Sequence, residues 1–575
     1  MIKLFKDLKA FTAGIIAVFI FVFLQSIADL YLPTLMADIV NNGMLQGDIG
    51  YIWRVGVVML AVAGGGAIVS IISSFLSSRI AMGFGKNLRN KIFSRVESYS
   101  LHTFEEIGTA SLITRTTNDI TQIQTVLVMM LRMMVSAPMM GIGGIIMAVS
   151  MNRGLTIILA VALPILVIFI ATVARKVIPL FKAIQKKIDK LNLVSRENLT
   201  GIRVIRAFNR IDDEKKRFDE ANLDLTNTAI KANKMMAAMM PVIMLIMNLT
   251  TVAIIWFGSI RIDLGDLQIG DMMAFLQYAM HIMMALLMLS MMFVMIPRAQ
   301  ASAVRINEVL DMKPEITDPL NPKKPEIQKG YLEFKEVTFS YPGAENPAIK
   351  DISFSTAPGE VTAIIGGTGS GKSTLIYLIP RFYDVDHGSV SIGGIDVREM
   401  AQEDLRSRIG FVSQKAVLFT GSIMENIQYG KENATEEEVK HAAEVAQASE
   451  FISSMEKGLY SEIAQGGVNV SGGQKQRLSI ARALIRKPEI YVFDDSFSAL
   501  DFKTDARLRT ALKRETADAA VIMVAQRVSS IMDADRIIVL DQGEIVDIGT
   551  HKELLKNCDI YREIVASQLS QEELA

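Results

Sequence analysis

The sequence predicts a chain in two parts: an α-helical membrane part with six spans, followed by an α/β domain with a phosphate-binding loop. Half of the 575 residues are hydrophobic and the mean hydropathy is +0.32, which is too apolar for an average soluble protein. The apolar excess lies almost wholly before residue 300. Beyond residue 330, short β-branched runs alternate with helical patterns, and residues 366–374 fit G-x-x-x-x-G-K-[ST].

Six apolar segments are each long enough to cross a bilayer as a helix, which takes about 20 residues. They lie near residues 11–35, 55–81, 126–150, 155–175, 236–260 and 272–297. The first follows Lys3, Lys6 and Lys9, as the apolar region of a signal peptide would. It has no clear small-residue cleavage site, so we interpret it as a retained span.

Charge in the connections predicts the orientation. The short loops near 38–54, 150–154 and 261–271 have few bases and together hold Asp38, Asp48, Asp263, Asp266 and Asp271. The two long connections, which contain residues 86–95 and 175–234, are rich in Lys and Arg. Because Lys and Arg mark the cytoplasmic side, we expect the N-terminus, both long connections and everything after residue 300 to face the cytoplasm. A formal net charge of −1 does not suggest a nucleic-acid binder, and a single cysteine, Cys558, excludes an internal disulfide framework.

The long connections carry helical patterns at 184–191 and 214–231, which would prolong the spans as polar helices. At their tips lie two short amphipathic pieces, around 104–107 and 208–214. Phe104 and Phe208 would each offer an aromatic ring to a partner surface. The alternative is a solvated tip of a helical hairpin.

Methionines form two stripes at helical spacing. One comprises Met236, Met240, Met244 and Met247; the other comprises Met273, Met280, Met284, Met288, Met291 and Met295, with Gln277 and His281 on the same face. Flexible thioethers suit a surface that receives many apolar shapes, but helix packing or lipid contact would also account for them. Asp29 and Arg132 are ionisable residues in or beside apolar segments, and they either face the bundle interior or lie at the headgroup level.

Residues 311–330 carry four prolines among charges, which predicts a linker. We therefore expect a membrane domain at 1–310, a linker at 311–330 and an α/β domain at 331–575.

The phosphate loop explains the chemistry expected of the second domain. Glycines let backbone N–H groups surround a polyphosphate, Lys372 reaches its β/γ-phosphates, and the Ser373 hydroxyl holds Mg²⁺. The loop consists of Gly366, Gly367, Thr368, Gly369, Ser370, Gly371, Lys372, Ser373 and Thr374.

Two further motifs follow the loop. The apolar run at 490–493 reads as a buried strand that ends in Asp494, a suitable Mg²⁺ ligand, and Asp495 comes next. Upstream, the turn Ser471, Gly472, Gly473, Gln474 opens a helix and offers a hydroxyl and exposed N–H groups to a second phosphate.

This combination resembles the ATP-binding cassette (ABC) family, and the fused six-span part resembles a type I ABC exporter half-transporter over essentially the whole chain. The resemblance implies that Tyr341 stacks on adenine, that Gln414 ligates Mg²⁺ and that Ser471–Gln474 is the signature motif. It also implies that Asp494 is the Walker B aspartate, that residues 498–501 form the D-loop and that the hairpin tips are coupling helices. In this family two such domains pair head to tail, with ATP between the loop of one and the signature of the other.

The chain departs from the family pattern at the hydrolytic site. Asp495 stands where the family places the glutamate that polarises the attacking water, Gln526 stands at the switch position of a histidine, and Gln465 replaces a glutamate before the signature. A carboxylate about one ångström out of place can cost about a hundredfold in rate. An amide can bind the γ-phosphate but cannot take up a proton. The chain therefore resembles the degenerate-site subunit of heterodimeric bacterial multidrug exporters.

The resemblance implies ATP-driven export of amphiphilic or hydrophobic compounds across a bacterial plasma membrane, with ATP and Mg²⁺ as cofactors and a second exporter half as partner. We expect a heterodimer rather than a homodimer. The alternatives are a lipid or peptide exporter, or an ATP-gated sensor or channel.

Overall fold

The computed structural model describes residues 1–325 and 330–568, apart from the side chains of Ile2, Phe293 and Val294. The described residues form two compact units. The first comprises Met1–Glu97 and Gly108–Met312, and the second comprises Ser98–Ile107 and the chain from Lys313 onward.

The first unit is helical, and the prediction of six membrane helices is confirmed. Its helices are α1 (Ile2–Phe5), α2 (Thr12–Asp38), α3 (Ile49–Glu97), α5 (Thr109–Thr114), α6 (Ile120–Pro138), α7 (Gly144–Met151), α8 (Arg153–Thr200), α9 (Ile202–Ala207), α10 (Ile211–Asp263) and α11 (Ile269–Asp311). At 1.5 Å per residue, the 53 residues of α10 span about 80 Å, far more than the roughly 30 Å hydrocarbon core of a bilayer. The predicted polar prolongations at 184–191 and 214–231 are therefore confirmed as parts of α8 and α10.

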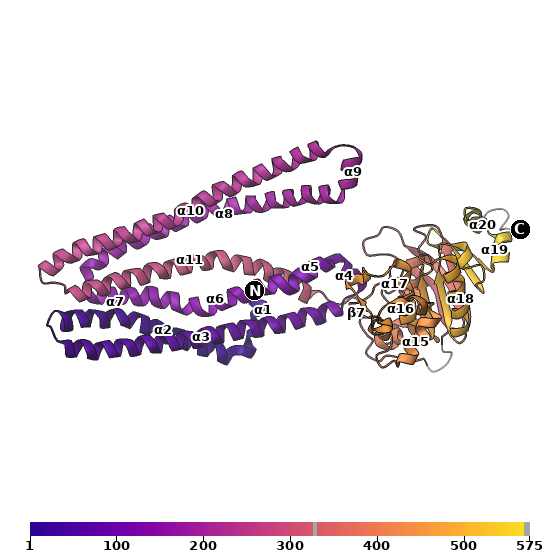
Figure 1. The fold of residues 1–575 in the computed structure, drawn as a ribbon, viewed down its shortest axis with the longest axis horizontal. Coiled ribbons are helices and arrows are strands. Elements are labelled where there is room, and N and C mark those ends of the chain that lie inside the picture. Colours follow the sequence, from indigo (N-terminus) through magenta and orange to yellow (C-terminus); the bar gives the residue numbers. More distant parts are fainter. Residues whose placement is uncertain (326–329, 569–575) are drawn as a thin grey trace. The chain divides into compact units, whose positions relative to one another are not determined.

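The two hairpin tips differ from each other. Figure 1 shows α8 and α10 side by side, closed by the short α9. The expectation of a separate piece at 208–214 is wrong in its bounds, because α9 ends at Ala207 and Ile211–Glu214 is the first turn of α10. Three acidic residues in that turn favour a helix N-terminus there. Phe208 lies between the two helices and is 74% exposed, so little of this ring is buried within the first unit.

The first tip belongs to the second unit. Residues Leu101–Ile107 form α4, and Leu101 packs against the buried core of that unit. The Ser100 hydroxyl donates to Glu315 Oε2 (2.6 Å), and His102 Nδ1 lies 3.1 Å from Glu315 Oε1. The segment is therefore attached to the chain that follows α11, and it is not a solvated tip.

Close helix packing in the first unit depends on glycines beside a proline. Pro138 ends α6 and is followed by a π-helical turn, η4 (Met139–Gly143). A Cβ at Gly143 would lie 2.5 Å from Leu30 Cδ1 on α2, and one at Gly144 would lie 2.8 Å from Ile282 Cγ1 on α11. The missing side chains thus let α2 and α11 approach this part of the third span closely.

A buried carboxylate connects the third span (Thr109–Met151) to the sixth (Ile269–Asp311). Asp119, in the π-helical turn η3 (Arg115–Asp119), is fully buried. Arg305 of α11 binds it through two nitrogens, with Nε 2.8 Å from Oδ2, and Ser302 Oγ donates to Oδ1 (2.9 Å). Arg115 adds a second connection to α11, because its NH1 donates to the Arg305 carbonyl (2.9 Å). Breaking such a pair leaves a desolvated charge without a partner.

We expect Asp119→Ala to lower the free energy of unfolding of the membrane unit by about 2 kcal/mol. This loss is smaller than for a fully buried ion pair, because Arg305 is half exposed. Thermal unfolding of the chain in lipid nanodiscs measures the effect. Arg210→Ala, which removes an exposed i,i+3 pair with Asp213, is the matched control and should leave stability nearly unchanged. Equal stability of the Asp119 variant and the native chain would contradict a stabilising role of the Asp119–Arg305 pair.

The second unit combines sheets with surrounding helices. Its strands are β1 (Leu332–Phe339), β2 (Ile349–Thr356), β3 (Val361–Gly366), β4 (His387–Ile392), β5 (Ile395–Asp396), β6 (Ile409–Val412), β7 (Gly421–Ser422), β8 (Glu462–Ile463), β9 (Ile490–Asp494), β10 (Ala520–Val524), β11 (Arg536–Asp541) and β12 (Glu544–Gly549). Its helices after α4 are α12 (Lys372–Leu378), α13 (Gln402–Ser407), α14 (Ile423–Gln428), α15 (Glu436–Val445), α16 (Ser449–Ser454), α17 (Gly472–Leu484), α18 (Phe502–Glu515), α19 (His551–Asn557) and α20 (Asp559–Ala566).

The main sheet has the order β12-β11-β3-β10-β9-β6 and is parallel except for β12. Along β3, Ala363 and Ile365 enter one buried cluster while Ile364 enters another. This period of two places a core on each face of the sheet, as a parallel sheet requires. The α/β prediction is confirmed, and a second sheet, β2-β1-β4-β5, adds to one of the cores.

Candidate functional site

Four adjacent parallel strands bring the predicted site residues to one edge. β3, β10, β9 and β6 are neighbours in this order, so their carboxyl ends meet. β3 ends at Gly366, and β9 ends at Asp494. Gln526 lies two residues beyond β10 and Gln414 two residues beyond β6. The carboxyl edge of a parallel sheet is where such folds bind ligands.

The phosphate loop has the backbone that its glycines predict. Gly369 and Gly371 have φ of +85° and +94°, in the left-handed region that side chains disfavour. A Cβ at Gly371 would also lie 2.8 Å from the Ala348 carbonyl oxygen. Lys372 Nζ donates to the carbonyls of Gly366 (2.9 Å) and Gly367 (2.6 Å), and burial lowers its pKa. A cation held at a glycine-rich loop in this way suits a polyphosphate.

The carboxylate at the end of β9 fits a divalent cation. Asp494 is 1% exposed, and within the described chain its buried Oδ2 has no hydrogen-bond partner. Ser373 Oγ lies 3.4 Å from its Oδ1. Burial raises the pKa of Asp494, and the neighbouring Asp495 adds to this, whereas Ser373 and Lys372 act in the opposite direction. A hard cation would favour the ionised form, and the oxygen donors of Asp494, Ser373 and Gln414 are of the type that Mg²⁺ takes.

Asp495 is held in an unusual conformation. Its φ is +45°, its backbone N–H donates to the Val524 carbonyl of β10 (3.0 Å), and the residue is 8% exposed. Gln414 Nε2 lies 3.4 Å from its Oδ2. The Asp495 carboxylate thus lies between the ends of β10 and β6, and the hydrogen bond to Val524 fixes the backbone of the residue.

Tyr341 lies beside the loop, two residues after β1. Its hydroxyl is 3.0 Å from Thr374 Oγ1, and its ring packs edge-on against Phe339 and Tyr383. An aromatic cluster next to the phosphate loop is a suitable place for a planar base.

The segment after β10 carries Gln526 at the surface. The N–H of Ala525 donates to the Ile364 carbonyl of β3 (3.2 Å), so the segment leaves the sheet next to the phosphate loop. No side-chain hydrogen bond of Gln526 is present in the chain as far as it is described, whereas its backbone carbonyl accepts from Gln568 Nε2 (2.8 Å).

The Ser-Gly-Gly turn is built as predicted, and its side-chain hydrogen bonds close on the turn itself. Ser471 is the N-cap of α17: its hydroxyl accepts from Gln474 N (3.3 Å), and Gln474 Oε1 accepts from Ser471 N (2.8 Å). Over residues 1–325 and 330–568, no hydrogen bond or ion pair joins Ser471–Gln474 to residues 366–374. Gly472 is exposed, and a Cβ there would meet nothing within 4 Å.

Two neighbours of the site were missed by sequence reasoning. Tyr377, one helical turn after Ser373, interacts electrostatically with Asp494, and its i,i+4 spacing from Ser373 could have indicated this. Gln568 is 42 residues from Gln526, and only the fold brings the two together.

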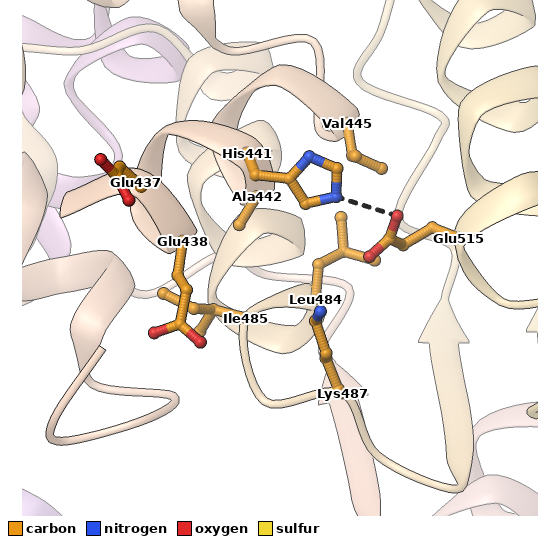
Figure 2. Close-up of a pocket in the computed structure, with 9 residues that line it drawn as sticks. All are labelled: Glu437, Glu438, His441, Ala442, Val445, Leu484, Ile485, Lys487 and Glu515. Carbon is orange, nitrogen blue, oxygen red and sulfur yellow. Dashed lines mark hydrogen bonds and ion pairs between the residues drawn. The ribbon is translucent and has the colours of Figure 1, made fainter. Parts of the chain in front are cut away.

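A surface pocket of about 260 Å³ lies elsewhere in the second unit (Figure 2). It is lined by residues of α15, the end of α17 and the end of α18, and His441 Nε2 lies 3.0 Å from Glu515 Oε2 across it. None of the predicted site residues lines this pocket.

Comparison with known proteins agrees with this architecture. Residues 15–286 match the family model of the ABC transporter transmembrane region, and residues 349–498 match that of the ABC transporter. An uncharacterized ABC transporter ATP-binding protein of Mycobacterium tuberculosis is 45% identical over 548 residues, covering 95% of this chain and 94% of the relative. A fatty acid ABC transporter ATP-binding/permease protein of Mycobacterium bovis is 33% identical over 475 residues, covering 82% and 75%.

The solved structure of a bacterial Atm1-family ABC exporter with ATP bound is similar over 97% of this chain and 99% of its own, with a TM-score of 0.80 and 26% identity. The chain therefore belongs to the ABC transporter family, as a multi-pass ABC exporter in which a six-helix membrane unit is fused to an ATP-binding ATPase unit for ATP-driven transport.

Proposed function

We propose that this chain is one half of a heterodimeric exporter of amphiphilic compounds, and that its own ATP site holds nucleotide but cleaves it slowly. The observation that carries the proposal is the pair Asp495 and Gln526 at the carboxyl ends of adjacent strands β9 and β10. A glutamate and a histidine at these places would reach further and could take up a proton.

In this proposal the residues of the phosphate loop bind ATP in the geometry described above. Lys372 leaves the carbonyls of Gly366 and Gly367 for the β/γ-phosphates, and Tyr341 supports the adenine. Ser373, Gln414 and Asp494 would hold Mg²⁺, which would neutralise phosphate charge.

The position of Asp495 accounts for slow cleavage. Its backbone is fixed by the hydrogen bond to Val524, so the side chain cannot advance to replace the missing methylene. Its Oδ2 also lies 3.4 Å from Gln414 Nε2, which draws the carboxylate toward β6. A base displaced by about one ångström supplies little activation of water.

A second subunit is needed to complete two sites. Among the described residues no hydrogen bond or ion pair joins Ser471–Gln474 to this chain's own loop, so the turn is available to the ATP held by a partner. The α8–α10 hairpin also leaves large apolar side chains exposed beyond bilayer length, among them Leu199, Val204 and Phe208. A partner subunit would cover this surface. We place the ATPase unit and the N-terminus on the cytoplasmic side of a bacterial plasma membrane, in line with the positive-inside pattern.

The methionine stripe on α11 supports an amphiphilic substrate. Met280, Met284 and Met291 are exposed, while Phe275, Tyr278 and Ile282 face the buried cluster on the other side of the helix. Packing within the described part of this unit therefore does not account for these thioethers, and a lipid, a partner or a substrate covers them. The relative named for fatty acid transport favours amphiphiles with an acyl chain as a second substrate class.

The transport test uses inside-out vesicles that contain the chain with its co-expressed partner. We expect ATP-dependent, uphill accumulation of ethidium or of a fluorescent fatty acid. We expect no accumulation when Lys372→Ala in this chain is combined with the equivalent substitution in the partner's phosphate loop. Downhill leakage that ATP merely gates would replace the exporter by a channel. Full transport by this chain as a verified homodimer would overturn the heterodimer.

A further inference from the structure

We propose that Gln568 is a positioning residue that sets the Gln526 side chain toward the γ-phosphate by fixing the backbone on either side of Arg527. This inference rests on the proposed function of the ATP site and on the γ-phosphate contact expected of the Gln526 amide. It concerns recognition of ATP over ADP and not the rate of cleavage.

The contact is a two-point pairing between a side-chain amide and the main chain. Gln568 Nε2 donates to the Gln526 carbonyl, and Gln568 Oε1 accepts from the Val528 N–H, both at 2.8 Å. A primary amide offers one donor and one acceptor side by side, which matches two backbone groups of an extended turn. No other standard side chain except asparagine has this pair, and asparagine is one methylene shorter.

Gln568 can act as a fixed support because α20 is anchored. Tyr561 and Val565 of α20 are at most 1% exposed and belong to the same buried cluster as Val528 and Ile531. His551 Nδ1 lies 2.7 Å from the Tyr561 hydroxyl, which ties α20 to α19. The Gln568 N–H donates to the Val565 carbonyl (3.0 Å), so the residue continues the last turn of α20.

The switch segment, residues 525–528, is also restrained at Arg527, whose carbonyl accepts from Ser530 N (3.2 Å) and whose guanidinium lies 5.5 Å from the centre of the Phe502 ring. Upstream it is held by the hydrogen bond from Ala525 N to the Ile364 carbonyl, and downstream by the burial of Val528. Between them Gln526 is exposed, and its amide has no partner in the described residues. Without Gln568 the carbonyl of Gln526 and the N–H of Val528 lose these partners. The Arg527–Val528 peptide plane keeps its bond from Ser530 N, whereas the plane between Gln526 and Arg527 can turn.

The experiment measures the equilibrium affinities of the full chain in nanodiscs for Mg²⁺-ATP and Mg²⁺-ADP, by displacement of a fluorescent nucleotide at low temperature. We expect Gln568→Ala to weaken ATP about fivefold, from the loss of two hydrogen bonds that position the amide, with ADP changed less than twofold. Gln568→Glu keeps the acceptor for Val528 and loses the donor, so we expect about a twofold loss. Ser567→Ala, which removes a hydroxyl of the same turn bonded to the Ile564 carbonyl, should change neither affinity.

A double-mutant cycle distinguishes this role from a merely structural one. Gln526→Ala should show the same selective loss of ATP, and Gln568→Ala added to it should cost nothing further. If Gln526→Ala is selective but Gln568→Ala weakens ATP and ADP alike, or neither, the positioning role is wrong while the proposed site stands. If Gln526→Ala leaves the ATP to ADP ratio unchanged, the proposed switch contact fails and the positioning role fails with it.

Discussion

Replacing Asp495 by Glu together with Gln526 by His is expected to raise ATP turnover at this chain's own site about a hundredfold. The added methylene moves the carboxylate about one ångström toward the attacking water, and misplacement on that scale costs about this much in rate. Imidazole in place of the amide lets the switch position take up charge as the γ-phosphate leaves. Turnover is measured as phosphate release by the purified chain in nanodiscs.

Asp495→Asn serves as the matched control, because it keeps the length of the native side chain and removes its charge. It should not exceed the native rate. The prediction is contradicted if the double variant stays as slow as the native chain while its ATP affinity is unchanged, since the slow step would then have another cause.

Gly472→Val is expected to reduce ATP turnover by the assembled pair at least a hundredfold while leaving ATP binding to this chain intact. Gly472 is exposed and a Cβ there has open space, so the substitution does not disturb the fold. In the pair, however, the added isopropyl group would stand where the partner's γ-phosphate approaches the Ser471 hydroxyl and the N-terminus of α17.

The measurement compares phosphate release by the pair with nucleotide affinity and thermal stability of this chain alone. A variant pair with native turnover would show that Ser471–Gln474 does not close the partner's site. Loss of stability in the isolated variant would instead identify Gly472 as a folding residue, against the geometry.

Much of the fold followed from local pattern. The apolar runs predicted the six long helices, because a bilayer requires about 20 apolar residues in a row. The loop glycines predicted a backbone that can surround a phosphate, which the left-handed φ of Gly369 and Gly371 allows, and the run ending in Asp494 predicted a buried strand. These features depend on residues close in sequence, so a single sequence can specify them.

Features that depend on contacts between distant residues could not be predicted in this way. The pairing of Asp119 with Arg305 joins residues 186 apart, and neither side chain differs in its local pattern from an exposed charge. The second hairpin tip was misplaced because Phe208 has the same amphipathic surroundings whether it lies inside a helix or between two. The strain at Asp495 is likewise set by its strand neighbour β10.

In the proposed pair, the loop of this chain holds ATP without cleaving it at a useful rate. The direct measurement is the identity of the nucleotide that remains on this chain, within the working pair, after turnover of ATP labelled at both the α- and the γ-phosphate. We predict that the two labels stay bound to this chain in nearly equal amounts, as intact ATP. Retention of the α-label alone, as ADP formed at the rate of the pair, would contradict the claim.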